Sequence, residues 1–170
     1  MRAVVASAVI AVLAALLPGC GPQERSPQPT VSEETMPPTD LTVAQAAQEN
    51  ARFVSLVSGE TVDPAPDRVE KVGCRTDPES FMSVGPPWRL RTTWWVDNPP
   101  APLVDGALAR LAGLTSEGFE RQPWTRPDPE PAHTRTYQDQ RGYIVTASAE
   151  KSPAGRYMLE VTAMSPCAND

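Results

Sequence analysis

Apolar residues recur every three or four positions in two segments, the spacing that places side chains on one face of an α-helix. The first segment, residues 39–59, offers Thr39 or Thr42 as an N-cap and Gly59 as a C-terminal stop. The second, residues 101–119, has Gly118 as its C-terminal stop. The pattern predicts two amphipathic helices. Their apolar stripes are Val43, Ala47, Ala51, Val54 and Val57 in the first and Leu103, Ala107, Leu111 and Leu114 in the second.

Alternation of apolar and polar residues predicts β-strands elsewhere in the chain, because side chains of a strand point to opposite faces in turn. In one strand, Trp88, Leu90 and Trp94 share a side. Prolines at positions 86, 87, 99 and 100 are expected to bracket this strand, since proline cannot donate to an interior ladder. The predicted strands are residues 88–96, 119–124, 134–139, 143–151 and 156–164.

Two helices and about five mainly antiparallel strands fit a single domain over residues 40–170. The last two strands have one apolar face, and their other faces are largely polar, for example at Thr146, Glu160 and Thr162. Such a sheet has one solvent-exposed face and one face that helices cover. We therefore expect an α+β fold, a two-layer sandwich in which two helices cover one face of the sheet.

The first 39 residues have a different character. Residues 3–17 form an uncharged apolar run that follows Arg2. The run is shorter than the stretch of about twenty apolar residues that a transmembrane helix needs. We predict that residues 1–19 are an export signal. Residues 20–39 are rich in proline and poor in large apolar side chains, which is typical of an extended, mostly disordered tether.

The end of the apolar run, Leu17-Pro18-Gly19-Cys20, resembles the lipobox of bacterial lipoproteins. The resemblance implies that the Cys20 thiol receives a diacylglyceryl group and that the chain is cut just before this cysteine. In its order of elements the chain also resembles small lipoproteins of high-GC Gram-positive bacteria, of the LppA type, a likeness that implies no activity. The alternative is a plain export signal followed by an incidental cysteine.

With Cys20 assigned to the lipid, Cys74 and Cys167 remain as a pair, and we expect them to form a disulfide in an exported protein. The bond would close a loop of 93 residues. The alternatives are two unpaired thiols or a metal site. Two cysteines and one histidine, His133, are too few soft ligands for structural zinc.

The net charge of the chain and the motifs absent from its sequence argue against several classes of function. The chain has a net charge of −6, and without residues 1–19 it has 14 basic against 21 acidic residues, a net charge of −7. A nucleic-acid partner is therefore not expected, and membrane attachment should rest on the acyl group rather than on a basic patch. The sequence contains no nucleotide-binding, metalloprotease or serine-hydrolase motif, so neither an enzyme nor a cofactor is predicted.

The hypothesis from sequence is a lipid-anchored protein on the extracytoplasmic side of the cell membrane, acting as a non-enzymatic interaction module. Its partner would be another envelope protein or the cell wall. The alternative is a carrier that holds a lipid or a glycan in a pocket between helices and sheet near Trp95. Arg89 and Arg91 lie on the same side of their strand as Trp95 and are the other candidate ligand contacts.

Overall fold

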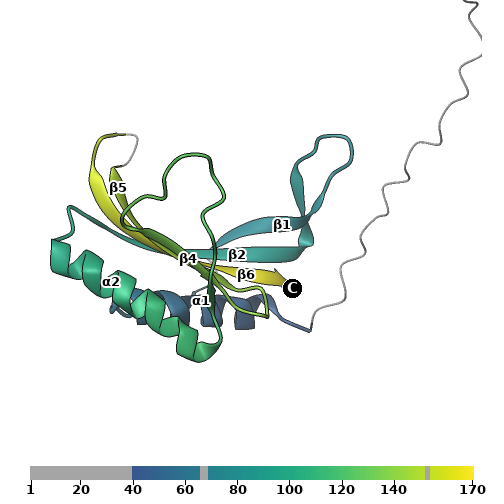
Figure 1. The fold of residues 1–170 in the computed structure, drawn as a ribbon. Helices are drawn as coiled ribbons and strands as arrows, with labels where there is room; N and C mark the ends of the chain where they lie inside the picture. Colours follow the sequence, from purple (N-terminus) through teal and green to yellow (C-terminus); the bar gives the residue numbers. More distant parts are fainter. Residues whose placement is uncertain (1–39, 66–68, 152–153) are drawn as a thin grey trace, which may run out of the picture. The chain divides into compact units, whose positions relative to one another are not determined.

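Two helices lie against one face of a six-stranded antiparallel sheet in the computed structural model, which describes residues 40–65, 69–151 and 154–170 (Figure 1). The helices are α1, Val43–Ser58, and α2, Ala101–Gly113. The strands are β1 Glu70–Thr76, β2 Ser83–Asp97, β3 Glu120–Arg121, β4 Thr134–Gln138, β5 Ile144–Lys151 and β6 Tyr157–Ala168, in the order β1-β2-β6-β5-β4-β3. The predicted α+β class is confirmed, with one strand more than expected. The predicted export signal, the lipidation site Cys20 and the tether lie outside the described residues.

Helix α1 begins and ends at the residues that the sequence indicates. The Thr42 hydroxyl accepts from the Gln45 backbone N–H, and the Gln45 side chain accepts from the Thr42 backbone N–H, which is a capping box. Gly59 follows the helix with φ 81°, a left-handed conformation that glycine adopts without a steric cost. All five residues of the predicted apolar stripe of α1 are buried.

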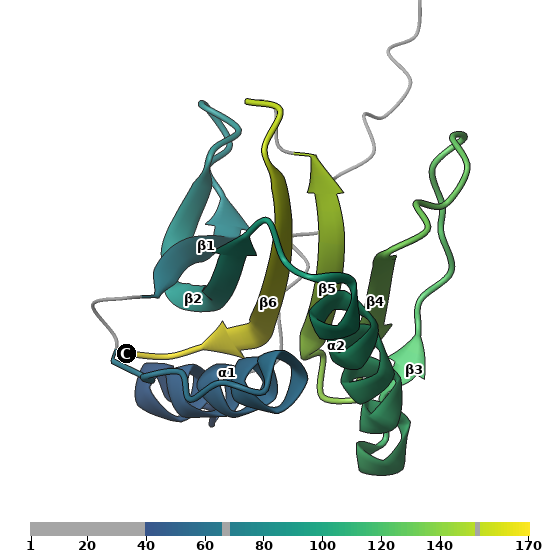
Figure 2. The same ribbon diagram turned by 90° about the vertical axis from the view of Figure 1, so that its left-hand side faces the viewer.

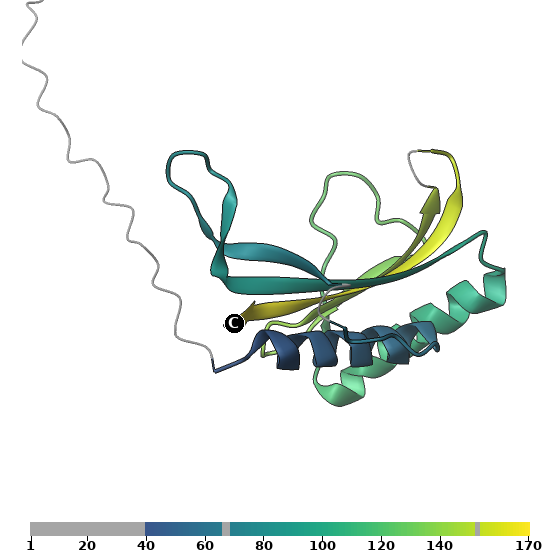
Figure 3. The same cartoon turned by 180° about the vertical axis from the view of Figure 1, so that it is seen from behind.

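An arginine of α2 fixes the two helices to each other. The Arg110 guanidinium donates to the carbonyl oxygens of Val57 and Ser58, at 2.9 and 2.8 Å. These carbonyls lie in the last turn of α1, where no intrahelical donor remains. The helices lie side by side beneath the sheet, as Figures 1 and 3 show from opposite sides.

The β1–β2 hairpin differs from the prediction in two ways. Strand β1 was missed because Val72 is its only large apolar side chain, so no alternation marks it. Strand β2 begins at Ser83 rather than after the prolines, and the prediction that residues 86 and 87 precede the strand is wrong. These prolines fit because the ladder leaves residues 85–87 unpaired: Gly73 pairs with Trp88, and the next pair on the β1 side is at Arg75.

The predicted disulfide between Cys74 and Cys167 is confirmed. It joins β1 to β6, although β2 lies between these strands in the sheet. Strands two places apart are normally about 10 Å from each other. The two Cα atoms are 6.2 Å apart because the ladder between β1 and β2 shifts its register at Cys74.

A second irregularity anchors α1 to the sheet. Ser165 and Pro166 of β6 lie opposite the single residue Leu90 of β2, which makes a β-bulge. The Leu90 backbone N–H donates to the Ser165 hydroxyl at 3.0 Å, and its carbonyl accepts from the Asn50 side chain at 2.9 Å. Asn50 is a fully buried residue of α1, so a helix side chain replaces a missing partner of the ladder.

Replacing Asn50 with alanine should lower the free energy of unfolding by about 1–3 kcal/mol, because the Leu90 carbonyl would stay buried without its donor. Urea unfolding followed by circular dichroism measures the loss. Gln48→Ala, at an exposed position of the same helix, is the control and should change the stability by less than about 0.5 kcal/mol. Equal losses in the two variants would contradict the anchoring role of Asn50.

The main core lies between the helices and the covered face of the sheet, where α2 crosses β5 and β4 (Figure 2). Within this core the fully buried Phe53 of α1 packs edge-on against Phe119 and Tyr143, with ring centres 5.0 and 5.5 Å away. A smaller cluster under α1 contains Leu90 and Ala168. The apolar faces predicted for the last two long strands supply most of the sheet side of the main core.

Candidate functional site

The face of the sheet away from α1 and α2 carries the residues that the sequence analysis selected; we call it the open face. Residues directly opposite each other in an antiparallel ladder share a face, which assigns its members strand by strand. Trp94 packs against the main core, so its neighbour Trp95 points to the open face, where it is 56% exposed. Arg89 and Arg91 lie on the same face of β2, and Cys167 is paired with Arg89.

Two rows of polar residues cross the open face from β2 to β4. The register places Trp95 opposite Glu160, then Ser148, then Thr134. The adjacent row consists of four threonines, one on each of the strands β2, β6, β5 and β4. These are Thr93, Thr162, Thr146 and Thr136.

Hydroxyl groups within these rows bond to one another. Thr136 and Thr146 share a hydrogen bond of 3.0 Å, and Thr134 and Ser148 share one of 2.9 Å. The Thr93 and Thr162 hydroxyls are 3.4 Å apart. Each hydroxyl has one proton and two lone pairs, so these bonds leave further hydrogen-bonding capacity at the surface.

The charged side chains of the open face are of both signs. Arg91 pairs with Glu70 at 3.3 Å, and Asp97 pairs with Arg156 at 3.2 Å. The Glu160 carboxylate, beside Trp95, accepts from the Thr162 hydroxyl at 3.1 Å. The two rows themselves contain a carboxylate and no cationic side chain.

The carrier hypothesis placed a ligand pocket between helices and sheet near Trp95, and that location is wrong. Trp95 lies on the open face, whereas the helices cover the other face. Trp95 also lines neither of two surface pockets that lie elsewhere among the described residues. Any ligand contact of Trp95, Arg89 and Arg91 therefore belongs to an exposed surface.

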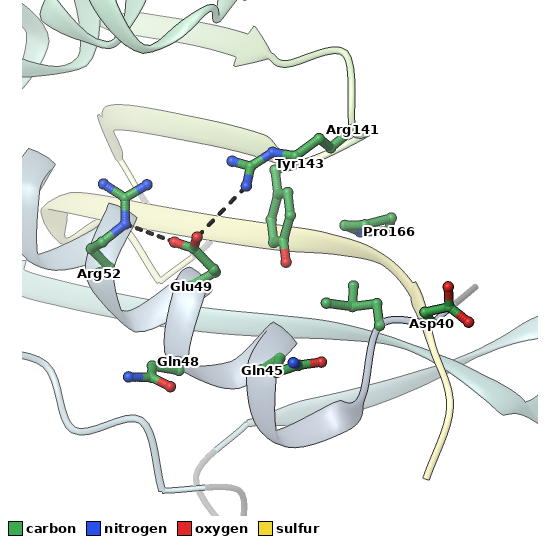
Figure 4. Close-up of a pocket in the computed structure, with 9 residues that line it drawn as sticks. Asp40, Gln45, Gln48, Glu49, Arg52, Arg141, Tyr143 and Pro166 are labelled. Atoms are coloured by element: carbon green, nitrogen blue, oxygen red, sulfur yellow. Dashed lines mark hydrogen bonds and ion pairs between the residues drawn. The ribbon is translucent and has the colours of Figure 1, made fainter.

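The larger pocket, of about 840 Å³, lies between α1, the turn from β4 to β5, and β6 (Figure 4). Glu49 lies between two arginines there: its carboxylate is 2.7 Å from Arg52 Nε and 3.6 Å from an Arg141 guanidinium nitrogen. Arg52 also pairs with Glu117 at 2.9 Å, and Arg141 with Asp139 at 2.7 Å. The lining residues are Asp40, Leu41, Gln45, Gln48, Glu49, Arg52, Arg141, Tyr143 and Pro166.

These ion pairs give the pocket a structural role. The Arg141 guanidinium carbon lies 4.9 Å from the centre of the Tyr143 ring. Burial, followed by the nearby Glu49 carboxylate, raises the pKa of Tyr143 above its ordinary value, so its hydroxyl stays protonated at neutral pH. The ion pair between Glu49 and Arg141 links α1 to the β4–β5 turn. Because Arg52 and Arg141 are both paired with carboxylates, neither guanidinium of the pocket is left unpaired for an incoming anion.

The turn between β1 and β2 exposes two large apolar side chains that the sequence analysis did not select. Phe81 is 81% exposed and Met82 is 66% exposed. The turn is ordered by Asp77, whose carboxylate accepts from the backbone N–H groups of Glu79 and Ser80. The signal in the sequence was a pair of large apolar residues between serines in a turn segment.

The remaining chemistry is sparse. His133 is exposed. Within residues 40–65, 69–151 and 154–170, no three His, Cys, Asp or Glu side chains are grouped as a metal site would need. Neither α1 nor α2 has the length and apolarity of a bilayer-spanning helix.

Comparisons of the chain with protein-family models, with curated proteins and with solved structures gave no match.

Proposed function

We propose that the protein is a lipid-anchored, extracytoplasmic envelope protein whose folded domain is a non-enzymatic interaction module. The observation that supports a module of this kind is the open face, where neither α1 nor α2 packs and Trp95 is 56% exposed. A large aromatic side chain held on a sheet face exposes apolar area to water, a cost that binding a partner would offset. The two arginines of the larger pocket, by contrast, are engaged by acidic side chains of the domain itself.

The anchor is proposed from the resemblance of residues 17–20 to a lipobox. A thiol at the end of an apolar export segment lies at the membrane surface, where a lipid can be attached. Each buried methylene contributes about 0.8 kcal/mol, so two or more acyl chains hold a protein stably while one chain holds it marginally. An acidic domain gains no attraction from anionic headgroups, which leaves the acyl group as the anchor.

Replacing Cys20 with alanine should move the full-length protein from the membrane fraction to the soluble fraction. The measurement is fractionation of expressing cells, a carbonate wash that removes peripheral proteins, and immunoblotting. Ser26→Ala, a substitution in the same segment that removes no thiol, is the control and should leave the protein in the membrane fraction. Retention of the Cys20→Ala protein after the wash would overturn the proposed anchor.

A further inference from the structure

We propose that the open face binds an uncharged glycan chain, with the indole of Trp95 stacked on a sugar ring and the hydroxyl rows beside it bonding to the sugar hydroxyls. The inference rests on the proposed function and names the ligand class of the same surface. It differs from the carrier hypothesis because the ligand lies across an exposed sheet rather than inside a pocket.

Trp95 has the position that stacking requires. One face of a pyranose ring presents several C–H groups and is apolar, whereas the rim of the ring carries hydroxyls. An indole that is 56% exposed offers a flat apolar surface to such a ring. Glu160 lies directly opposite Trp95 in the ladder and can accept hydrogen bonds from the rim.

The polar rows suit a repeating ligand. Four strands carry one hydroxyl residue each in the threonine row, and neighbouring strands are about 4.8 Å apart. The row from Thr93 to Thr136 therefore spans three strand spacings, about 14 Å. A chain of sugar units lying across the strands would meet a hydroxyl group at regular intervals, whereas a compact ligand would leave part of the row unused.

The carboxylates beside Trp95 favour an uncharged ligand over an anionic one. Beside Trp95 the rows carry the carboxylate of Glu160, and Glu150 follows on the next strand, where it accepts from Ser148 at 3.2 Å. These carboxylates favour donors such as sugar hydroxyls and disfavour anionic polysaccharides or anionic lipid headgroups. Two cations of this face are paired with carboxylates, Arg91 with Glu70 and Arg156 with Asp97.

The loop from β3 to β4 rises beside the sheet on the side away from the helices (Figures 1 and 2). It is held by a hydrogen bond of 2.6 Å from the Trp124 indole N–H to the Asp128 carbonyl and by an ion pair between Arg121 and Glu130. A fixed loop at this edge borders the open face and would confine a chain to the strands from β2 to β4.

The test is isothermal titration calorimetry of the purified full-length protein with chitotetraose and cellotetraose, two uncharged glycan chains, and with a galacturonate tetramer as an anionic chain of equal length. We expect at least one uncharged tetramer to bind and the anionic one to bind at least about tenfold more weakly. Trp95→Ala should weaken the binding at least about tenfold, in line with the loss of a stacked ring. Thr146→Val, which removes a hydroxyl of the threonine row at similar volume, should weaken it by about two- to fivefold.

Phe81→Ser is the matched control, because it removes an exposed aromatic ring from the β1–β2 turn, and it should leave the affinity unchanged. If Trp95→Ala lowers the melting temperature, Trp95→Phe keeps a ring and should bind with an affinity between those of the wild type and Trp95→Ala. Absence of binding to both uncharged tetramers, unchanged binding by Trp95→Ala, or equal binding of the anionic tetramer would overturn the proposal. So would Trp95-dependent sedimentation with phosphatidylglycerol vesicles, which would identify a lipid surface instead. A negative glycan result leaves the fractionation of Cys20→Ala as a separate test of the anchor.

Discussion

Replacing Cys74 or Cys167 with serine is expected to lower the free energy of unfolding by about 4–5 kcal/mol. The disulfide closes a loop of 93 residues, and in the chain-entropy account a loop of this size removes that much conformational freedom from the unfolded chain. A loss of this size is a large fraction of the stability of an ordinary domain. Guanidinium unfolding of each variant, extrapolated to water, measures it.

The double variant distinguishes a bond from two independent effects. Either substitution breaks the same bond. The free energy of unfolding of the double variant, Cys74→Ser with Cys167→Ser, should therefore lie within about 0.5 kcal/mol of that of the less stable single variant. A reducing agent should destabilise the wild type and leave the double variant unchanged. Losses that add in the double variant would show that the thiols act separately.

Local signals in the sequence predicted α1 well, whereas α2 ends at Gly113, before the predicted stop at Gly118. At α1 the cap at Thr42, the stop at Gly59 and the apolar stripe all come from residues within a few positions of one another, so no knowledge of the tertiary structure was needed. The long strands β5 and β6 were predicted for a similar reason, since burial of one face imposes alternation along each strand.

The missed features depend on pairing between distant segments. Strand β1 is at the edge of the sheet with one large apolar residue, Val72, and it forms because β2 provides a partner. Gly73 in this strand lies so close to the Val84 backbone that a Cβ there would overlap it. Likewise, the role of Asn50 follows from the bulge opposite Leu90, and a bulge depends on the register between two strands.

The face on which Trp95 lies could be predicted from the sequence. Alternation along β2 predicts that the side chains of Trp94 and Trp95 point to different faces of the sheet. Because the helices cover the apolar face, where Trp94 lies, Trp95 could not line a pocket between helices and sheet. The carrier hypothesis overlooked this alternation when it placed Trp95 at such a pocket. What the sequence could not provide is the alignment of Thr93 with hydroxyl groups on three other strands, because it depends on three separate registers.

Replacing Phe53 with alanine is expected to lower the free energy of unfolding by about 3–5 kcal/mol, the range for removing a large aromatic side chain from a core. Phe53 is fully buried, and its ring joins α1 to Phe119, just before β3, and to Tyr143, just before β5. Edge-on aromatic pairs of this kind contribute about 0.5–1.5 kcal/mol beyond the area they bury. Urea unfolding of the purified protein, followed by circular dichroism, measures the loss.

Leu56→Ala is the control for this prediction, because Leu56 lies on the same helix but is 43% exposed. Its substitution should cost less than about 1 kcal/mol, since the side chain leaves little cavity behind. Phe53→Ala combined with Phe119→Ala should cost less than the sum of the two single losses, because both substitutions remove the same ring contact. Equal losses at Phe53 and Leu56, or strictly additive losses in the double variant, would contradict a core organised around the Phe53 ring.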